Sequence, residues 1–272
     1  MTNSRQRTRL TATLVILGYF LLSGNGVTSM SASPSSESGA STDAASANLP
    51  NLTTDEVVSR MVEANARRSS DLSGFTGTRT YNLDYRGFPG NREAHMVVAA
   101  RYTAPSTKEF DIISESGSKL IQSRVLKRLL VSEKEAADAE NQRRNALNTN
   151  NYKFTLLGTR PSQYGGCYRL QAEPRRENKY LFRGEICVNA RDFAVESIQA
   201  EPAKSPSFWI KQTSIEHRYQ KIGEFWLPAF NKSVTNVVLG GTATLTIEYT
   251  DYKLAPRRSD TEFNRRSKTI KV

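Results

Sequence analysis

The feature of this sequence that most restricts its fold is a long series of segments in which apolar and polar residues alternate. The last is the clearest: Leu245, Ile247 and Tyr249 alternate with threonines and a glutamate. A period of two places successive side chains on opposite faces of a strand. We therefore predict an antiparallel sheet with one apolar face, which must curl around its own contents or be covered by helices.

Turn signals divide the alternating part into nine segments, one of which is a hairpin. Three segments come before a helical stretch and the others follow it. They are residues 72–85, 92–102 and 108–116, then 152–159, a hairpin within 165–187, 194–200, 207–222, 225–238 and 242–254. This order predicts an α+β domain.

Two stretches have the period of helices. The first begins at Thr53 or Thr54, carries Asp55 and Glu56 in its first turn, and is expected to end near Ser70. The second, residues 118–147, places five apolar side chains on one stripe: Ile121, Val125, Leu126, Leu129 and Leu130.

The second stretch has two interpretations that the sequence leaves open. Ser132 and Glu135 have the spacing of a capping box, which predicts a break there and a second, charged helix to about Leu147. The first half must cover an apolar surface. It can be a helix that completes the core, or a movable lid over a cavity.

The two cysteines of the chain lie in the hairpin segment. If it folds about Glu177, Cys167 lies opposite Cys187, and the same register pairs Arg169 with Glu185 and Gln171 with Arg183 on the cysteine face. The other face is then apolar, with Tyr168, Leu170, Ala172, Phe182 and Ile186. We predict a disulfide between Cys167 and Cys187. The alternative is two unpaired thiols, and the spacing does not fit a zinc site.

The N-terminus has the pattern of an export signal. Arg5, Arg7 and Arg9 precede an apolar run at 10–22, and small and polar residues follow up to about residue 32. The run is too short to span a bilayer core of about 30 Å. We therefore predict a signal peptide at 1–32 and a periplasmic or secreted protein that is soluble after cleavage, which agrees with a disulfide.

Both ends of the remaining chain are expected to be disordered. Residues 33–50 are mostly small and polar and predict a flexible tether, and residues 256–272 form a basic tail. The tail and the signal peptide carry most of the formal net charge of +11. The domain at 51–255 is thus only mildly basic, and we expect no nucleic-acid partner, although the tail can contact anionic membrane or cell wall.

No catalytic pattern stands out. His95 is expected on the solvent face of its strand and His217 in the core. Neither lies in a G-x-S-x-G motif, and HExxH and P-loop motifs are missing from the sequence. We predict a protein that is not an enzyme and that needs no cofactor or metal.

The order of these elements resembles the LolA/LolB-like family of outer-membrane lipoprotein carriers and lipoprotein-sorting proteins. The resemblance covers about residues 52–254 and includes the helix TTDEVVSRMVEAN, the turn TAPSTKEF and the strand FWLPAF. It implies an incomplete β-barrel, a curved antiparallel sheet with an N-terminal helix and a helical lid inserted after the third strand. It also implies acyl chains bound in the cavity between sheet and helices.

We accordingly expect a periplasmic binding protein or chaperone for a lipid, an acylated protein or another apolar ligand. The alternative is an envelope interaction or sensor domain with a filled core and a protein partner. Arg79 lies on the otherwise apolar face of its strand and needs either an internal acid or a ligand head group. The expected cavity lining is Arg79, Tyr81, Leu83, Met96, Val98, Phe110, Ile112, Ile121, Val125, Leu129, Trp209, Ile215, Tyr219, Leu245 and Ile247.

Overall fold

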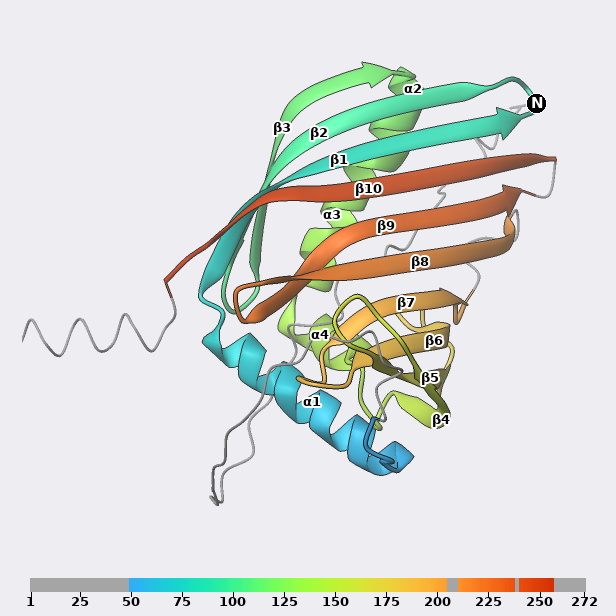
Figure 1. Cartoon of the computed structure of the whole chain (residues 1–272). Helices are drawn as coiled ribbons and strands as arrows, with labels where there is room; N and C mark the ends of the chain where they lie inside the picture. The colour runs from blue at the N-terminus through green and yellow to red at the C-terminus, as the bar shows by residue number, and fades with distance from the viewer. Residues whose placement is uncertain (1–48, 205–209, 238–239, 257–272) are drawn as a thin grey trace, which may run out of the picture.

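A computed structural model describes residues 49–204, 210–237 and 240–256 of the chain (Figure 1). The expected signal peptide, Trp209, and almost all of the tether and the basic tail lie outside these ranges. None of the helices within them is long and apolar enough to cross a membrane.

Within these ranges the strands form one ten-stranded antiparallel sheet, as the alternation predicts. Its order is β3-β2-β1-β10-β9-β8-β7-β6-β5-β4. The strands are β1 (Gly74–Gly87), β2 (Arg92–Thr103), β3 (Thr107–Gly117), β4 (Tyr152–Arg160), β5 (Cys167–Pro174), β6 (Phe182–Asn189), β7 (Val195–Pro202), β8 (Ile210–Ile222), β9 (Phe225–Val237) and β10 (Gly241–Leu254).

Strands that follow each other in the chain are paired, as in a meander, except β3 and β4. The first strand pairs with the last along most of its length, from Phe75 opposite Leu254 to Gly87 opposite Gly241. β3 and β4 follow each other in the chain but are the two edges of the sheet. The helices that join them therefore stand at the place where pairing would close a barrel, and the sheet remains open.

The N-terminal helix α1 (Thr54–Asp71) begins as the sequence predicts. Thr53 is its N-cap, and a capping box joins Thr53 and Glu56 in both directions. These bonds satisfy backbone N–H groups that have no partner within the first turn. Val57, Val58 and Met61 are buried on the face that meets the sheet.

The helical insertion differs from the prediction in where it breaks. α2 (Lys119–Ile121), a π-helical turn at Gln122–Leu126 and α3 (Lys127–Ala136) form one continuous run, and α4 (Ala139–Asn145) follows with Asp138 as its N-cap. The predicted capping box at Ser132 is therefore wrong, because the helix continues through that residue.

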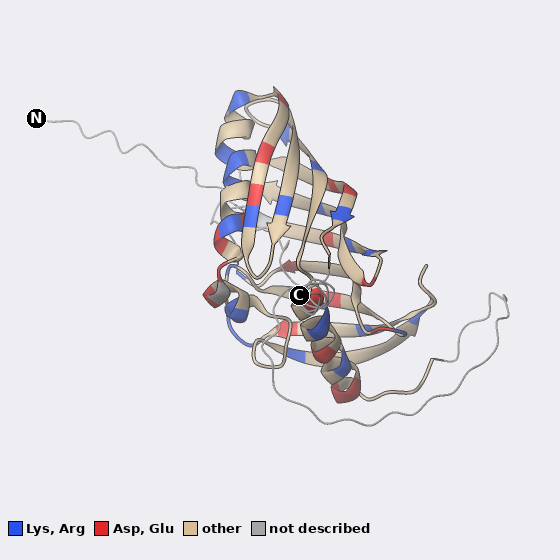
Figure 2. Cartoon of the chain, turned by 90° about the vertical axis from the view of Figure 1, so that its left-hand side faces the viewer, with Lys and Arg blue, Asp and Glu red and all other residues tan. Residues whose placement is uncertain are grey.

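Two helices cover two halves of the same face of the sheet, which we call the inward face. α1 packs with residues of β4 to β8, and α2–α3 packs with residues of β1, β2 and β10. In Figure 1, α1 lies against the lower strands and α3 crosses behind the upper ones. Figure 2 shows Lys and Arg along the α2–α3 run beside acidic positions of β3, where Lys127 contacts Glu115 at 3.0 Å.

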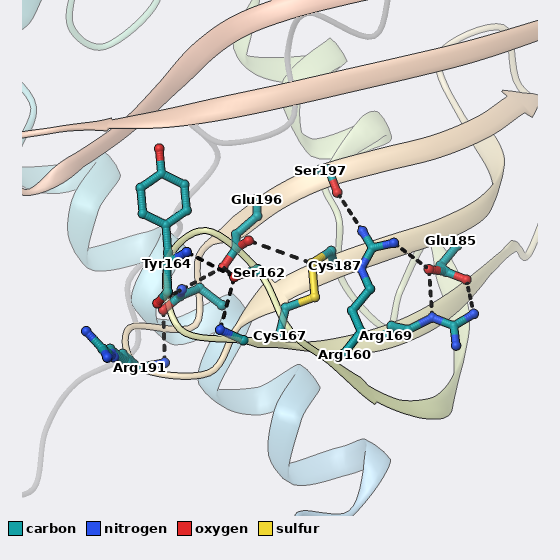
Figure 3. The surroundings of a disulfide bond; sticks show 12 residues. Arg160, Ser162, Tyr164, Cys167, Arg169, Glu185, Cys187, Arg191, Glu196 and Ser197 are labelled. Atoms are coloured by element: carbon teal, nitrogen blue, oxygen red, sulfur yellow. Dashed lines mark hydrogen bonds and ion pairs between the residues drawn. A yellow bond between two sulfur atoms is a disulfide. The ribbon is translucent and has the colours of Figure 1, made fainter. Parts of the chain in front are cut away.

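The predicted disulfide between Cys167 and Cys187 is present, with Cα atoms 5.5 Å apart (Figure 3). The predicted register is wrong by two residues, since Cys167 lies opposite Asn189, and Arg169 opposite Cys187. A shift of two keeps every side chain on its face. The disulfide and the Arg169–Glu185 ion pair therefore form diagonally, whereas Gln171 and Arg183 each bond to Glu173 instead of to each other.

Candidate functional site

The expected cavity lining is gathered mainly under α2–α3. Eight of those residues belong to one buried apolar cluster, and two more, Phe110 and Val125, pack against it from partly buried positions. The eight are Tyr81, Leu83, Met96, Val98, Ile121, Leu129, Leu245 and Ile247. The helical run and the three strands β1, β2 and β10 thus share one apolar contact.

Four of the expected residues are not part of this cluster. Ile215 and Tyr219 are buried in the other cluster, with α1. Ile112 is 40% exposed, because β3 is an edge strand that only β2 flanks in the sheet. Trp209 lies outside the described residues.

Arg79 is buried and pairs with an internal acid. Its Nη1 lies 2.6 Å from Oε2 of Glu133 on α3, and the side chains are 6% and 4% exposed. Of the two partners that the sequence left open, the structure thus contains the acid. Nζ of the buried Lys108 is 3.9 Å from the same oxygen. The guanidinium also lies over the Phe110 and Tyr249 rings, 4.9 and 5.2 Å from their centroids.

This charged cluster holds α3 against the sheet. Burial alone raises the pKa of a carboxyl, but Arg79 and Lys108 outweigh that effect and lower the pKa of Glu133. The carboxylate in turn raises the pKa of Arg79 against the opposing effect of burial. For Lys108 burial dominates and lowers the pKa to about 7. Arg79 and Glu133 are therefore both ionised at neutral pH.

A second group of buried polar side chains lies on the inward face of the three strands β8, β9 and β10. His217, Tyr219, Asn231, Ser233 and Tyr249 each have a buried oxygen or nitrogen that lacks a hydrogen-bond partner within the described chain. We call these five residues the polar seam. Native proteins leave few such atoms unpaired, because each costs roughly 1–3 kcal/mol when buried.

The seam is tied together by its own contacts. Asn231 Nδ2 donates to His217 Nδ1 across 3.0 Å, so the ring proton resides on Nε2, the atom without a partner. The centroid of the His217 ring lies 4.5 Å from that of the Tyr219 ring and 6.5 Å from that of the Tyr249 ring. Burial lowers the pKa of His217 to about 3, so the imidazole is neutral at neutral pH.

Sequence reasoning missed several residues that make this site. Glu133 is one of several charged residues on its helix, and Lys108 is the first residue of a predicted strand. Neither position carries a pattern that predicts a buried charge. Asn231 and Ser233 gave a clearer signal. They occupy positions on β9 that alternate with outward ones, where an apolar residue is expected.

The surroundings of the disulfide are structural. Glu196 lies beside both cysteines and accepts hydrogen bonds from Ser162 at 3.0 Å and Asn189 at 2.6 Å (Figure 3). Burial raises the pKa of this carboxyl. The three residues are close enough to ligate a metal, but zinc binds thiolates and the two sulfurs are bonded to each other.

The sequence matches one family model, described as a family of unknown function (DUF5686), over residues 144–252. This segment runs from the end of α4 into β10 and covers less than half of the chain. No match to a curated protein is found.

Three solved structures are similar to the chain over about three quarters of its length. They are a DUF1329 family protein from Desulfovibrio piger (9% identity, TM-score 0.39, 75% of this chain and 94% of that one), a LolA superfamily protein from Nitrosomonas europaea (12%, 0.32, 75% and 94%) and a putative outer membrane lipoprotein-sorting protein domain from Vibrio parahaemolyticus (9%, 0.37, 74% and 92%). At these TM-scores the overlap is loose, and the likeness assigns no function to this chain.

Proposed function

We propose that this is an exported, non-enzymatic binding protein that holds an apolar or amphiphilic ligand between its sheet and the α2–α3 run. The observation that carries the proposal is the way the apolar inward face of β1, β2 and β10 is covered. The cover is a separate helical run, inserted between the two edge strands and fixed by a buried ion pair.

The helical run can move without disrupting the sheet. The strands are paired in one continuous order from β3 to β4, with the β1–β10 pair joining the first strand to the last. The helices add no strand to that order. Displacing α2–α3 therefore breaks side-chain contacts only. The joint between Ala136 and Ala139 gives a place for the run to turn.

An acyl chain can replace the contacts that the helix loses. Four buried side chains of the run, Ile121, Leu126, Leu129 and Leu130, contribute on the order of 2 kcal/mol each. A chain of about 16 carbons gains roughly 0.8 kcal/mol per buried methylene, which is about 12 kcal/mol. Displacing the run also breaks the buried Arg79–Glu133 pair, so the exchange becomes more favourable as the ligand chain lengthens and is unfavourable for a short chain.

The site supports binding better than catalysis. Its ionisable groups Arg79, Glu133 and Lys108 contact one another. Within the described residues, His217 hydrogen-bonds to the Asn231 amide and not to a nucleophile or a carboxylate. A general base needs a proton within hydrogen-bond reach and a suitable pKa. We therefore include the absence of enzymatic activity in the proposal.

A second candidate is a protein-interaction domain of the cell envelope with a filled core. It is favoured by the edge strand β3, which presents Ile112 and Ile113 at 40% and 62% exposure. Exposed apolar edge strands are templates for pairing with another chain. In this case Leu126, which is fully buried, belongs to a permanent core.

The test is native mass spectrometry of the oxidised protein purified from the periplasm, followed by organic extraction and titration with a fluorescent acyl probe. We expect a bound lipid or fatty acid that is lost in Leu126→Asp. The matched control is Leu120→Asp on the same helical run, because Leu120 is 53% exposed and should retain the ligand.

Circular dichroism must show that both variants are folded. If Leu126→Asp unfolds the chain, Leu129→Ala serves instead, since it leaves no charge in the core. A bare mass combined with no uptake of the acyl probe by the wild-type protein contradicts the binding function and favours the interaction domain.

A further inference from the structure

We infer that the polar seam binds the uncharged head of an amphiphilic ligand, a group such as a glycerol that both donates and accepts hydrogen bonds. This inference rests on the proposed function and adds the chemical class of the ligand. It is drawn from His217, Tyr219, Asn231, Ser233 and Tyr249.

The five residues provide a set of unused hydrogen-bonding atoms in one part of the inward face. They are His217 Nε2, the hydroxyls of Tyr219, Tyr249 and Ser233, and Asn231 Oδ1, and all five side chains are more than nine-tenths buried. Three hydroxyls can donate or accept, the imidazole N–H donates, and the amide oxygen accepts. A ligand must therefore offer both donors and acceptors to satisfy them.

Register places these residues near one another on the inward face. His217 lies opposite Asn231 across β8 and β9, and Ser233 is two residues along β9 on the same face, opposite Leu245 of β10. Tyr249 follows Ile247 on that face of β10. Because Leu245, Ile247 and Tyr249 also belong to the apolar cluster under α2–α3, the seam adjoins the place proposed for the acyl chain.

The charges around the seam favour an uncharged head. Arg79, whose guanidinium lies over the Tyr249 ring, is paired with Glu133 at 2.6 Å. Burial keeps His217 neutral, since it lowers the pKa to about 3. A charged head buried here would need a counter-ion that is already engaged, and an unpaired buried charge is very unfavourable.

Two tyrosine substitutions separate a binding role from a structural one. Tyr219→Phe and Tyr249→Phe keep the rings and remove only hydroxyls that have no hydrogen-bond partner among the described residues. Deleting such a group should raise the melting temperature of the free protein and weaken ligand binding. The matched control is Tyr252→Phe, which loses the hydrogen bond that Tyr252 donates to Pro228 O at 2.9 Å and should lower the melting temperature.

The experiment is competition between the apolar fluorophore diphenylhexatriene and three ligands with the same oleoyl chain: 1-oleoylglycerol, oleate and methyl oleate. We expect 1-oleoylglycerol to displace the fluorophore at about tenfold lower concentration than the other two, the factor for one or two extra hydrogen bonds. The double variant Tyr219→Phe/Tyr249→Phe, measured against its own affinity for the fluorophore, should lose most of this preference.

The outcomes distinguish the inference from the function on which it rests. If the three oleoyl ligands compete equally, or if the double variant keeps the preference, the seam holds water only and the inference is overturned while the binding function stands. A preference for oleate shows a charged head and also overturns it. If neither the fluorophore nor any oleoyl ligand binds, both proposals fail together.

Discussion

The buried pair between Arg79 and Glu133 leads to the most direct test of how α3 is held. Replacing Glu133 with Gln keeps the shape of the side chain and leaves Arg79 charged at 6% side-chain exposure. Removing one partner of such a pair costs about 3–5 kcal/mol, because the remaining charge is desolvated and uncompensated. Lys108, whose Nζ lies 3.9 Å from the same oxygen, loses its contact with the carboxylate in the same variant.

The control is an ion pair with equally good geometry that water can reach. Arg169 donates to both carboxylate oxygens of Glu185, at 2.9 and 2.7 Å, but the side chains are 36% and 21% exposed. We expect Glu185→Gln to cost roughly 0.5–1 kcal/mol, as exposed pairs do. The difference between the two variants isolates the effect of burial.

The assay is urea unfolding of the oxidised protein at pH 8, followed by fluorescence and circular dichroism. The double variant Arg79→Met/Glu133→Leu should lose far less stability than the two single replacements together, with a coupling of about 2 kcal/mol or more. If Glu133→Gln costs no more than Glu185→Gln, the pair is not desolvated, and the idea that it fixes α3 to the sheet is refuted.

Three further predictions concern other parts of the domain. Reduction of Cys167–Cys187, which closes a loop with a sequence separation of 20, should lower the free energy of unfolding by about 3 kcal/mol; an unchanged urea midpoint contradicts this. His217 has a folded-state pKa of about 3 against an ordinary 6.5, so only the unfolded chain takes up this proton as pH falls between them. Wild-type stability should therefore fall over that range, whereas His217→Leu should flatten this part of the pH profile in urea titrations. Thr53→Ala should cost about 1 kcal/mol in thermal unfolding, because it breaks the capping box with Glu56, and Ser70→Ala at the other end of α1 should cost less.

The local structure of the domain could be predicted from its sequence. Alternation identified the strands, and the Thr53 cap with Glu56 placed the start of α1, because both depend on neighbouring residues only. The apolar faces of the disulfide hairpin were also predicted correctly. A register error of two residues conserves the face of every side chain, so the pattern fixes the faces and leaves the register open.

The tertiary structure decided how these parts meet. The partner of Arg79 is 54 residues away, on a helix whose other charges point to solvent, and no local pattern selects Glu133 among them. The polar seam likewise needs the pairing of β8, β9 and β10 to bring its residues near one another. Sequence determines which side chains share a face of one element, whereas contacts between distant elements depend on strand order and on which edges stay unpaired. In this protein those are the contacts that form the candidate site.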